Sequence, residues 1–262
     1  MTEDRRPLKA AALTSAAVAL LLLLLALTAQ LGHSTTAPVS SAPQVRFVAA
    51  VADPSVGTER VARHGSSAIN RSNRLDADPS WVTDTARASG IDPVALHAYG
   101  RAVLLLSRAK PDCRLGWTTL AAIGRIESDH GRIGGRRLKP DGTSSSLIIG
   151  PALDGDQFAA IPATPSSARL HGDRQWDHAV GPMQFIPTTW ASWASDGNFD
   201  GSADPGNLFD ASYAAARYLC AAGSDLTSGQ GWTAAVHSYN HSLQYVADVL
   251  AWADAYASRT SK

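Results

Sequence analysis

The stretch from Leu120 to Arg132, LAAIGRIESDHGR, places a carboxylate where a helix would otherwise carry an apolar side chain. Read as a helix, it brings Leu120, Ile123 and Glu127 onto one stripe, because residues three and four apart share a helical face. A carboxylate on a core-facing stripe loses hydration, which disfavours the ionised form and raises its pKa. The stretch therefore predicts either a general acid at Glu127 or a buried Glu that pairs with an Arg.

Other segments predict a mainly helical domain around this stretch. Asp92-Pro93 is a cap and first-turn pair, and the apolar residues that follow it at helical spacing predict a helix that ends near Lys110-Pro111. The helix that carries Glu127 should open around Trp117-Thr118, with Gly131 as its stop. Further helices are expected over 187–194, 211–222 and 233–238, and a longer one capped by Ser242 should present a stripe of Tyr245, Val249, Trp252 and Tyr256.

Residues 133–178 interrupt this helical pattern with many Gly, Pro, Ser and Asp residues and one short strand-like piece at 147–149. A long irregular stretch inside a compact domain is usually functional or packed on itself. We interpret this region as one wall of a substrate groove with a small β region.

The first 31 residues predict an export segment. A basic end is followed by 22 mostly apolar residues, Ala10 to Leu31, which suit either a cleaved signal peptide or a membrane anchor. Leu27 stands where a cleavage site prefers a small residue, so we favour an uncleaved anchor with its basic end in the cytoplasm. The domain is then exported and stays at the outer face of the membrane, or is secreted if the signal is cleaved.

Residues 32–79 are rich in Ser, Thr, Ala and Pro and lack repeating apolar faces, so we interpret them as a disordered tether. The folded domain is expected over 80–258. Lys and Arg together number 23, as do Asp and Glu, and this balance gives no reason to expect a nucleic-acid partner. We expect a monomer.

Four motifs resemble one enzyme family. They are Glu-Ser-Asp-His-Gly at 127–131, AVGPMQFIPTTW at 179–190, the acidic loop 196–210 and Tyr-Asn-His-Ser at 239–242. In this order and spacing the chain, over roughly 90–256, resembles the lytic murein transglycosylases of the membrane-bound lytic transglycosylase B type, in their actinobacterial form. The resemblance implies a lysozyme-like, mainly helical domain and peptidoglycan glycan strands as the substrate.

The resemblance also implies a mechanism. Glycosidic cleavage commonly uses two carboxylates, but this family uses one Glu as acid and then base. The substrate's N-acetyl group and 6-hydroxyl replace the second carboxylate and the water, which leaves a 1,6-anhydro-N-acetylmuramoyl end. Glu127 matches that Glu, and no cofactor is required. A hydrolytic muramidase would need Asp129 or Asp177 as a second carboxylate, and a catalytically silent wall-binding domain is the alternative outside enzymes.

Several residues match the family's substrate groove. Gln184, Tyr218, Tyr239 and Asn240 match groove positions where amides and phenols orient the sugar and the acid. Aromatic rings also stack on the apolar faces of sugars, so Trp176 and Trp190 are further candidates for groove walls. Core packing is the alternative for any single aromatic residue among them.

The acidic loop opens like a calcium loop. Asp196, Asn198 and Asp200 stand at positions 1, 3 and 5 with Gly201 at position 6, but position 12 is Asn207 instead of Glu. In a longer variant loop known in relatives of the family, Asp210 would close the site. A structural calcium would then be held by Asp196, Asn198, Asp200, Ser202 (through its carbonyl) and Asp210, and the alternative is a calcium-free turn that caps the next helix.

Two further patterns involve cysteine and histidine. Cys113 and Cys220 are the only cysteines, and outside the cytoplasm they are expected to form a disulfide, with two buried free thiols as the alternative. His237 and His241 have the spacing of a zinc helix, but the Glu and third ligand of such sites are missing, so we do not predict zinc.

Overall fold

The computed structural model describes residues 75–156 and 158–261. The predicted export segment 1–31 and the tether up to residue 74 lie outside the described residues. In the described part of the chain, the elements are α3 (Pro79–Ser89), α4 (Pro93–Ala109), η2 (Pro111–Cys113), α5 (Trp117–Ser128), η3 (Ile133–Gly135), β1 (Ile149–Ala152), α6 (Pro165–His171), β2 (His178–Val180), α7 (Pro187–Trp193), α8 (Leu208–Gly223), α9 (Gly229–Tyr239) and α10 (Leu243–Thr260). The expected mainly helical architecture with a small β region is confirmed. None of the described helices is long and apolar enough to cross a bilayer.

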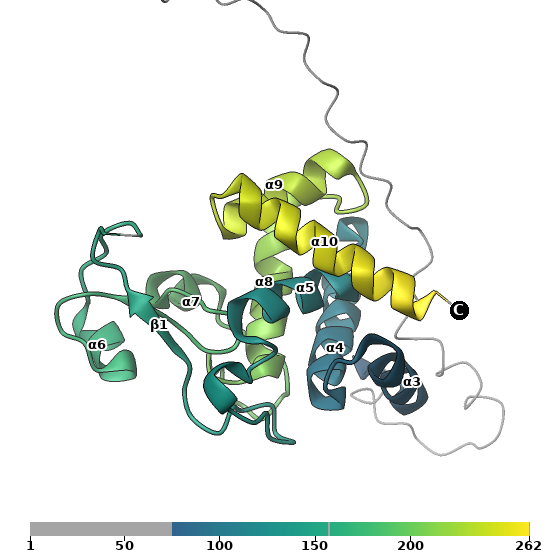
Figure 1. The fold of residues 1–262 in the computed structure, drawn as a ribbon, viewed down its shortest axis with the longest axis horizontal. Helices are drawn as coiled ribbons and strands as arrows, with labels where there is room; N and C mark the ends of the chain where they lie inside the picture. Colours follow the sequence, from purple (N-terminus) through teal and green to yellow (C-terminus); the bar gives the residue numbers. More distant parts are fainter. Residues whose placement is uncertain (1–74, 157, 262) are drawn as a thin grey trace, which may run out of the picture. The chain divides into compact units, whose positions relative to one another are not determined.

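The helices pack mainly as three pairs. α10 lies along α5, α4 packs against α8, and α9 packs against α8 (Figure 1). The apolar faces predicted for α4 and α5 meet in one core, in which Leu96, Tyr99, Leu120 and Ile123 have no exposed surface. Glu127 therefore continues a stripe whose other members are fully buried.

Most predicted helices are confirmed, with boundaries that their capping residues explain. α8 starts at Leu208 instead of residue 211, because the side chain of Asn207 caps it by accepting from the amide of Phe209 (2.9 Å). α9 starts at Gly229 instead of residue 233, because Ser228 caps it. Ser242 caps α10 as predicted.

The helices α3 and α6 and the strand β2 were not predicted. α3 has the same Asp-Pro start as α4, with Asp78 as its cap, and α6 starts with a Thr164 capping box. β1 covers Ile149–Ala152, later than the predicted piece at 147–149, and pairs antiparallel with the short β2. Both strands are too short to give a clear alternating pattern, which is why their sequence signal is weak.

The disulfide prediction is confirmed. Cys113 and Cys220 form a bridge with their Cα atoms 5.6 Å apart, and no cysteine remains free. The bridge joins η2, just before α5, to α8. It therefore fixes the start of the helix that carries Glu127.

Candidate active site

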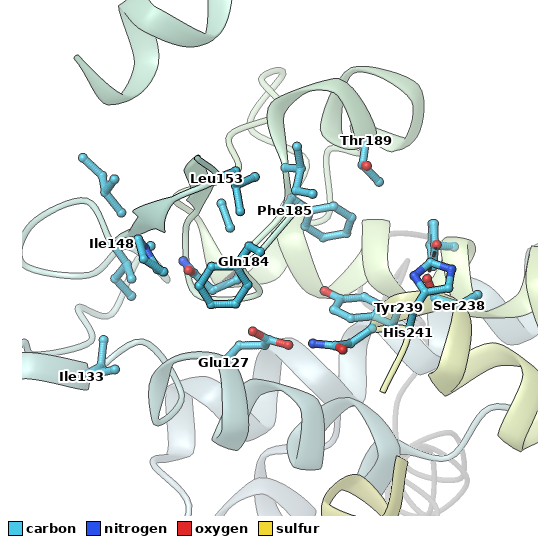
Figure 2. A pocket seen from close by; sticks show the side chains of 18 of the residues that line it. Glu127, Ile133, Ile148, Leu153, Gln184, Phe185, Thr189, Ser238, Tyr239 and His241 are labelled. Atoms are coloured by element: carbon cyan, nitrogen blue, oxygen red, sulfur yellow. Dashed lines mark hydrogen bonds between the residues drawn. The ribbon is translucent and has the colours of Figure 1, made fainter. Parts of the chain in front are cut away.

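A cavity of about 630 Å³ opens at the far end of α5 (Figure 2). Its wall combines the irregular region after α5, the loop before α7, and the junction between α9 and α10. The lining residues are Glu127, Ile133, Arg136, Ile148, Ile149, Gly150, Pro151, Leu153, Phe158, Ala179, Gln184, Phe185, Ile186, Thr189, Tyr218, Ser238, Tyr239, Asn240 and His241. In Figure 2, Ile133 and Ile148 lie at one end, Ser238, Tyr239 and His241 at the other, and Glu127 between them.

Glu127 has the environment of an acid that keeps a large neutral fraction near pH 7. Its side chain is partly buried, and burial raises the pKa of Glu127 to about 7, although the hydrogen bond from Tyr245 lowers it. The Tyr245 hydroxyl donates to Oε1 of Glu127 at 2.5 Å. None of the ion pairs in the described part of the chain includes Glu127, and the neighbouring Arg125 pairs with Asp129 instead. The alternative interpretation of Glu127, a buried carboxylate that pairs with an Arg, is therefore not seen among the described residues.

The end of α5 is held by buried hydrogen bonds. The helix stops at Ser128, because Asp129 (φ 51°) and His130 (φ 59°) adopt left-handed conformations before the predicted stop at Gly131. His130 lies between the hydroxyls of Tyr99 (3.0 Å) and Tyr256 (3.1 Å), and burial lowers its pKa to about 3, so it stays neutral. These contacts offset the cost of the unusual backbone and fix the turn that follows Glu127.

Gln184 lies across the pocket from Glu127 (Figure 2). It ends a tight turn between Val180 and Phe185, which exchange backbone hydrogen bonds of 2.9 and 3.0 Å. Gln184 itself is left-handed (φ 49°), and its side-chain amide donates to the carbonyl of Gly181 at 2.9 Å. The turn is tied to α5 because the buried hydroxyl of Ser128 donates to the carbonyl of Pro182 at 2.6 Å.

Two tyrosine rings form part of the wall. The hydroxyl of Tyr218 donates to the carbonyl of Ser238, and that of Tyr239 donates to the carbonyl of Met183, both at 2.7 Å. Their rings meet edge to face, with centroids 5.7 Å apart. Because both hydroxyls are bonded to the backbone, the rings themselves face the cavity as apolar surfaces.

Glu127 is the only carboxylate among the residues that line the described pocket. Asp129 caps α5 and pairs with Arg125 and Arg132. Asp177 has no exposed surface, and its Oδ1 is 2.8 Å from Nε2 of His171. The structure therefore brings neither alternative carboxylate to the cavity.

Residues 168–254 match the family model of the transglycosylase SLT domain. The protein is an enzyme of the transglycosylase class. The match includes Gln184, Tyr218, Tyr239 and Asn240 but not Glu127, which precedes it in the chain. The cavity brings Glu127 and the matched segment together.

Among curated proteins, no match to the chain was found. Among solved structures, the chain is similar to the Escherichia coli lytic transglycosylase Slt35 in complex with bulgecin A, with 15% identity, a TM-score of 0.43, and coverage of 78% of this chain and 83% of that chain. It is also similar to Slt35 in complex with calcium, at 15% identity, a TM-score of 0.44 and the same coverage.

Gln184, Tyr218, Tyr239 and Asn240 all line the pocket of this transglycosylase domain, but the two predicted tryptophans do not. Trp176 lies in the loop between α6 and β2, where its backbone amide is bonded to Asp173. Trp190 is buried and packs edge to face on Phe185, with ring centroids 5.5 Å apart, as the core-packing alternative expects.

The residue that bonds to Glu127 was not assigned a role from the sequence. The resemblance gave Tyr239 a part in orienting the acid, but Tyr245 makes that contact. The apolar stripe of α10 located Tyr245 on the buried face without indicating its partner. The available signal was the hydroxyl of Tyr245 on an otherwise apolar stripe, because the hydroxyl of a buried tyrosine usually has a hydrogen-bond partner.

The acidic loop is a network of turns. Asp196 accepts hydrogen bonds from the amides of Phe199 (2.6 Å), Asp200 (3.2 Å) and Gly201 (2.9 Å). The buried Asp210 accepts from the amides of Gly197, Asn198 and Asp204. In the part of the chain that the structure describes, no group of three or more His, Cys, Asp or Glu side chains is arranged to hold a metal ion. The calcium loop stays a prediction.

Proposed function

We propose that this protein is a peptidoglycan lytic transglycosylase. It cleaves the β-1,4 bond between N-acetylmuramic acid and N-acetylglucosamine without water and leaves 1,6-anhydro-N-acetylmuramoyl ends. The SLT-domain match supports the reaction class. The observation that carries the proposal is that the described pocket presents a single carboxylate, Glu127, whose pKa is raised to about 7.

The first step needs an acid. Neutral Glu127 donates its proton to the glycosidic oxygen, the bond from that oxygen to C1 of the muramoyl sugar breaks, and the leaving sugar departs as an alcohol. The substrate's N-acetyl group stabilises the positive charge that develops at C1. Burial keeps Glu127 protonated close to neutral pH, which is the state this step requires.

The second step needs a base. Ionised Glu127 takes the proton of the 6-hydroxyl of the same muramoyl sugar as O6 bonds to C1, which closes the anhydro ring and restores the neutral acid. A pKa near 7 suits both directions of transfer, because neither protonation state is strongly favoured. No second carboxylate or bound water is needed.

The pocket supplies the groups that a sugar would contact. The side-chain amides of Gln184 and Asn240 can both donate to and accept from hydroxyl and acetamido groups. The rings of Tyr218 and Tyr239 give apolar surfaces for the faces of the sugar. A hydrolytic muramidase is less well supported, because Asp129 and Asp177 lie outside the lining residues.

The test is the chemistry of the products. The purified full-length protein, Glu127→Gln and Asp129→Asn are incubated with peptidoglycan, and the released fragments are identified by mass spectrometry. Asp129→Asn is the matched control, because it makes the same carboxyl-to-amide change outside the pocket. We expect anhydro ends from the wild type and Asp129→Asn and none from Glu127→Gln.

Two other results would replace the proposal. Fragments with reducing ends would identify a muramidase, and the search for a second carboxylate would reopen. Binding to peptidoglycan without any released fragment, from all three proteins, would identify a wall-binding domain.

We also propose that the protein is exported and anchored by residues 10–31, with its domain facing the cell wall. The apolar N-terminal segment supports export, and the Cys113–Cys220 disulfide suits a compartment outside the cytoplasm. Extraction of membranes with alkaline carbonate tests the anchor: an anchored protein stays with the membrane, and a cleaved one is recovered in the soluble fraction.

A further inference from the structure

His178 is the first residue of β2 and lies behind the pocket wall. Its Nδ1 is 2.8 Å from the carbonyl oxygen of Gly150, and its Nε2 is 3.1 Å from Oδ2 of Asp173. A carbonyl and a carboxylate can only accept hydrogen bonds. Both ring nitrogens must therefore donate, and only the doubly protonated imidazolium form of His178 can do so.

A neutral His178 could keep one of these two contacts. Its other ring nitrogen would turn a lone pair toward an acceptor at about 3 Å, so that contact would have to open. The carboxylate of Asp173 is the stronger acceptor and would retain the remaining proton on Nε2. Deprotonation of His178 therefore releases the carbonyl of Gly150.

The groups that face His178 favour its charged form. Asp177 accepts from the backbone amide of His178 at 3.0 Å, and the ring of His171 lies 4.8 Å from that of His178. His171 accepts from the amide of Asp173 through Nδ1, so its own proton is on Nε2, which donates to Asp177. Burial alone would lower the pKa of His178, but the Gly150 carbonyl, Asp173 and Asp177 together raise it above its usual value.

Gly150 connects His178 to the pocket. It lies on β1, lines the cavity, and has Gln184 packed against its α-carbon: a Cβ added there would be 2.5 Å from Oε1 of Gln184. β1 is only four residues long and pairs with the three-residue β2, with a register irregularity between Ile149 and Ala152. Such a short pairing gives the strand little rigidity of its own, so the His178 contact adds a side-chain restraint on Gly150 to the backbone hydrogen bonds of Ile148 and Leu153.

We propose that His178 is a positioning residue that acts only as an imidazolium: it holds Gly150 against Gln184, and the groove loses affinity for glycan as His178 is deprotonated. The protein then binds glycan more tightly at mildly acidic pH, where His178 holds the carbonyl of Gly150, than at alkaline pH, where this contact is lost. The ligand in this inference rests on the proposed function, whereas the protonation state of His178 does not.

The binding experiment uses Glu127→Gln as its background, because this change removes both turnover and the titration of Glu127. The affinity of the full-length protein for soluble glycan strands is measured from about pH 5.5 to about pH 9, a range that spans histidine titration. We expect the dissociation constant to rise roughly tenfold through one transition. Adding His178→Asn should abolish that transition, because the amide at this position can donate to the Gly150 carbonyl at every pH.

Three further variants in the same background identify the titrating group. Asp173→Asn keeps an oxygen for the amides of Gln175 and Trp176 and turns its NH2 group toward Nε2 of His178. Neutral His178 can then keep its proton on Nδ1 and its bond to Gly150, so the transition should become smaller. His97→Asn removes a histidine that pairs with Asp76 outside the pocket and should leave the transition unchanged. His241→Asn removes the histidine that lines the cavity, and the His178 transition should persist.

An NMR experiment gives a readout that needs no ligand. At about pH 6.5, the usual midpoint of a histidine, both ring nitrogens of His178 should carry protons in most molecules, and the side-chain amide resonance of Gln184 should shift with the midpoint of His178. The proposal is overturned if His178 is neutral at this pH, if the Gln184 resonance does not follow it, or if glycan affinity does not depend on His178. Absence of glycan binding at every pH would refute the proposed function, and the two NMR results would still decide the role of His178.

Discussion

The raised pKa of Glu127, on which its proposed role depends, lowers the stability of the fold. Burial raises its pKa from 4.5 to about 7, which means that the folded state holds the neutral acid more readily than the unfolded chain does. Folding stability therefore falls as the pH rises from 4.5 to about 7, where the unfolded chain ionises first. The hydrogen bond from Tyr245 limits this cost, because it stabilises the ionised form that the second chemical step needs.

The Tyr245 contact predicts a specific change in pH dependence. In Tyr245→Phe the carboxylate loses a donor, so the pKa of Glu127 should rise above about 7. The alkaline limb of kcat/KM, where the acid is lost, should move to higher pH. We also expect kcat at the optimum to fall roughly tenfold, because the carboxyl is no longer oriented. The measurement is a pH–rate profile on peptidoglycan with the wild type alongside.

Tyr239→Phe is the matched control for this profile. It makes the same Tyr-to-Phe change at a residue that lines the pocket, but the hydroxyl of Tyr239 donates to the carbonyl of Met183 and not to Glu127. Its alkaline limb should stay at the wild-type pH, whatever happens to the rate. An unmoved limb in Tyr245→Phe would mean that the acid of the free enzyme is not Glu127 or that Tyr245 does not bond to it in solution.

At the scale of the elements, the sequence predicted the long helices well because their apolar stripes and capping residues are local signals. α4, α5 and α10 all carry such stripes, and each begins close to the residue predicted. The strands β1 and β2 pair across the irregular region, so their positions depend on contacts that are distant in sequence. The same limit applies to Tyr245, whose partner Glu127 is 118 residues away.

The acidic loop before α8 carries a prediction about calcium. Its donors are all oxygens, which suits this cation. Burial raises the pKa of Asp210, three backbone amides lower it, and the nearby charge of Asp196 raises it again, so a bound cation would relieve repulsion between the two. The Oδ2 atoms of Asp196 and Asp210 each accept from one amide, and each can also coordinate a cation.

We therefore expect millimolar calcium to raise the melting temperature by a few degrees. A ligand at about ten times its dissociation constant stabilises the folded state by about 1.4 kcal/mol. Asp200→Asn should weaken the response, because it removes a charge from the exposed part of the loop. Magnesium at equal concentration is the control ion. An unchanged melting temperature with calcium would leave the loop as a set of turns that caps α8, held by the amide contacts of Asp196 and Asp210 and by Arg101, which donates to the carbonyl of Gly197 at 2.7 Å.

For the whole molecule, the proposed catalytic pocket depends on segments that the chain brings together from far apart. Glu127 comes from α5, Gln184 from the turn before α7, and Tyr239 and Asn240 from the junction of α9 and α10. The family model covers only the later of these segments. Anything that loosens α5 from the later helices should therefore affect activity as well as stability.

The disulfide is the covalent link between these parts. It closes a loop with a sequence separation of 107, and the buried Cys113 and Cys220 lie where η2 meets α8. In the chain-entropy account, a loop of this length contributes about 4 to 5 kcal/mol by restricting the unfolded chain. The carbonyl of Cys113 also accepts from the amide of Leu226 at 2.8 Å, so the region keeps one non-covalent tie without the bridge.

The double variant Cys113→Ala/Cys220→Ala tests this contribution. We expect its melting temperature to fall by roughly 10 °C, given about 2 to 4 °C per kcal/mol for a domain of this size. Activity at low temperature should remain, because neither cysteine lines the pocket. Thermal unfolding with and without a reductant provides the control: reduction should lower the melting temperature of the wild type and leave that of the double variant unchanged. Equal melting temperatures for the oxidised wild type and the variant would show that the bridge adds no measurable stability to the packing of the helices.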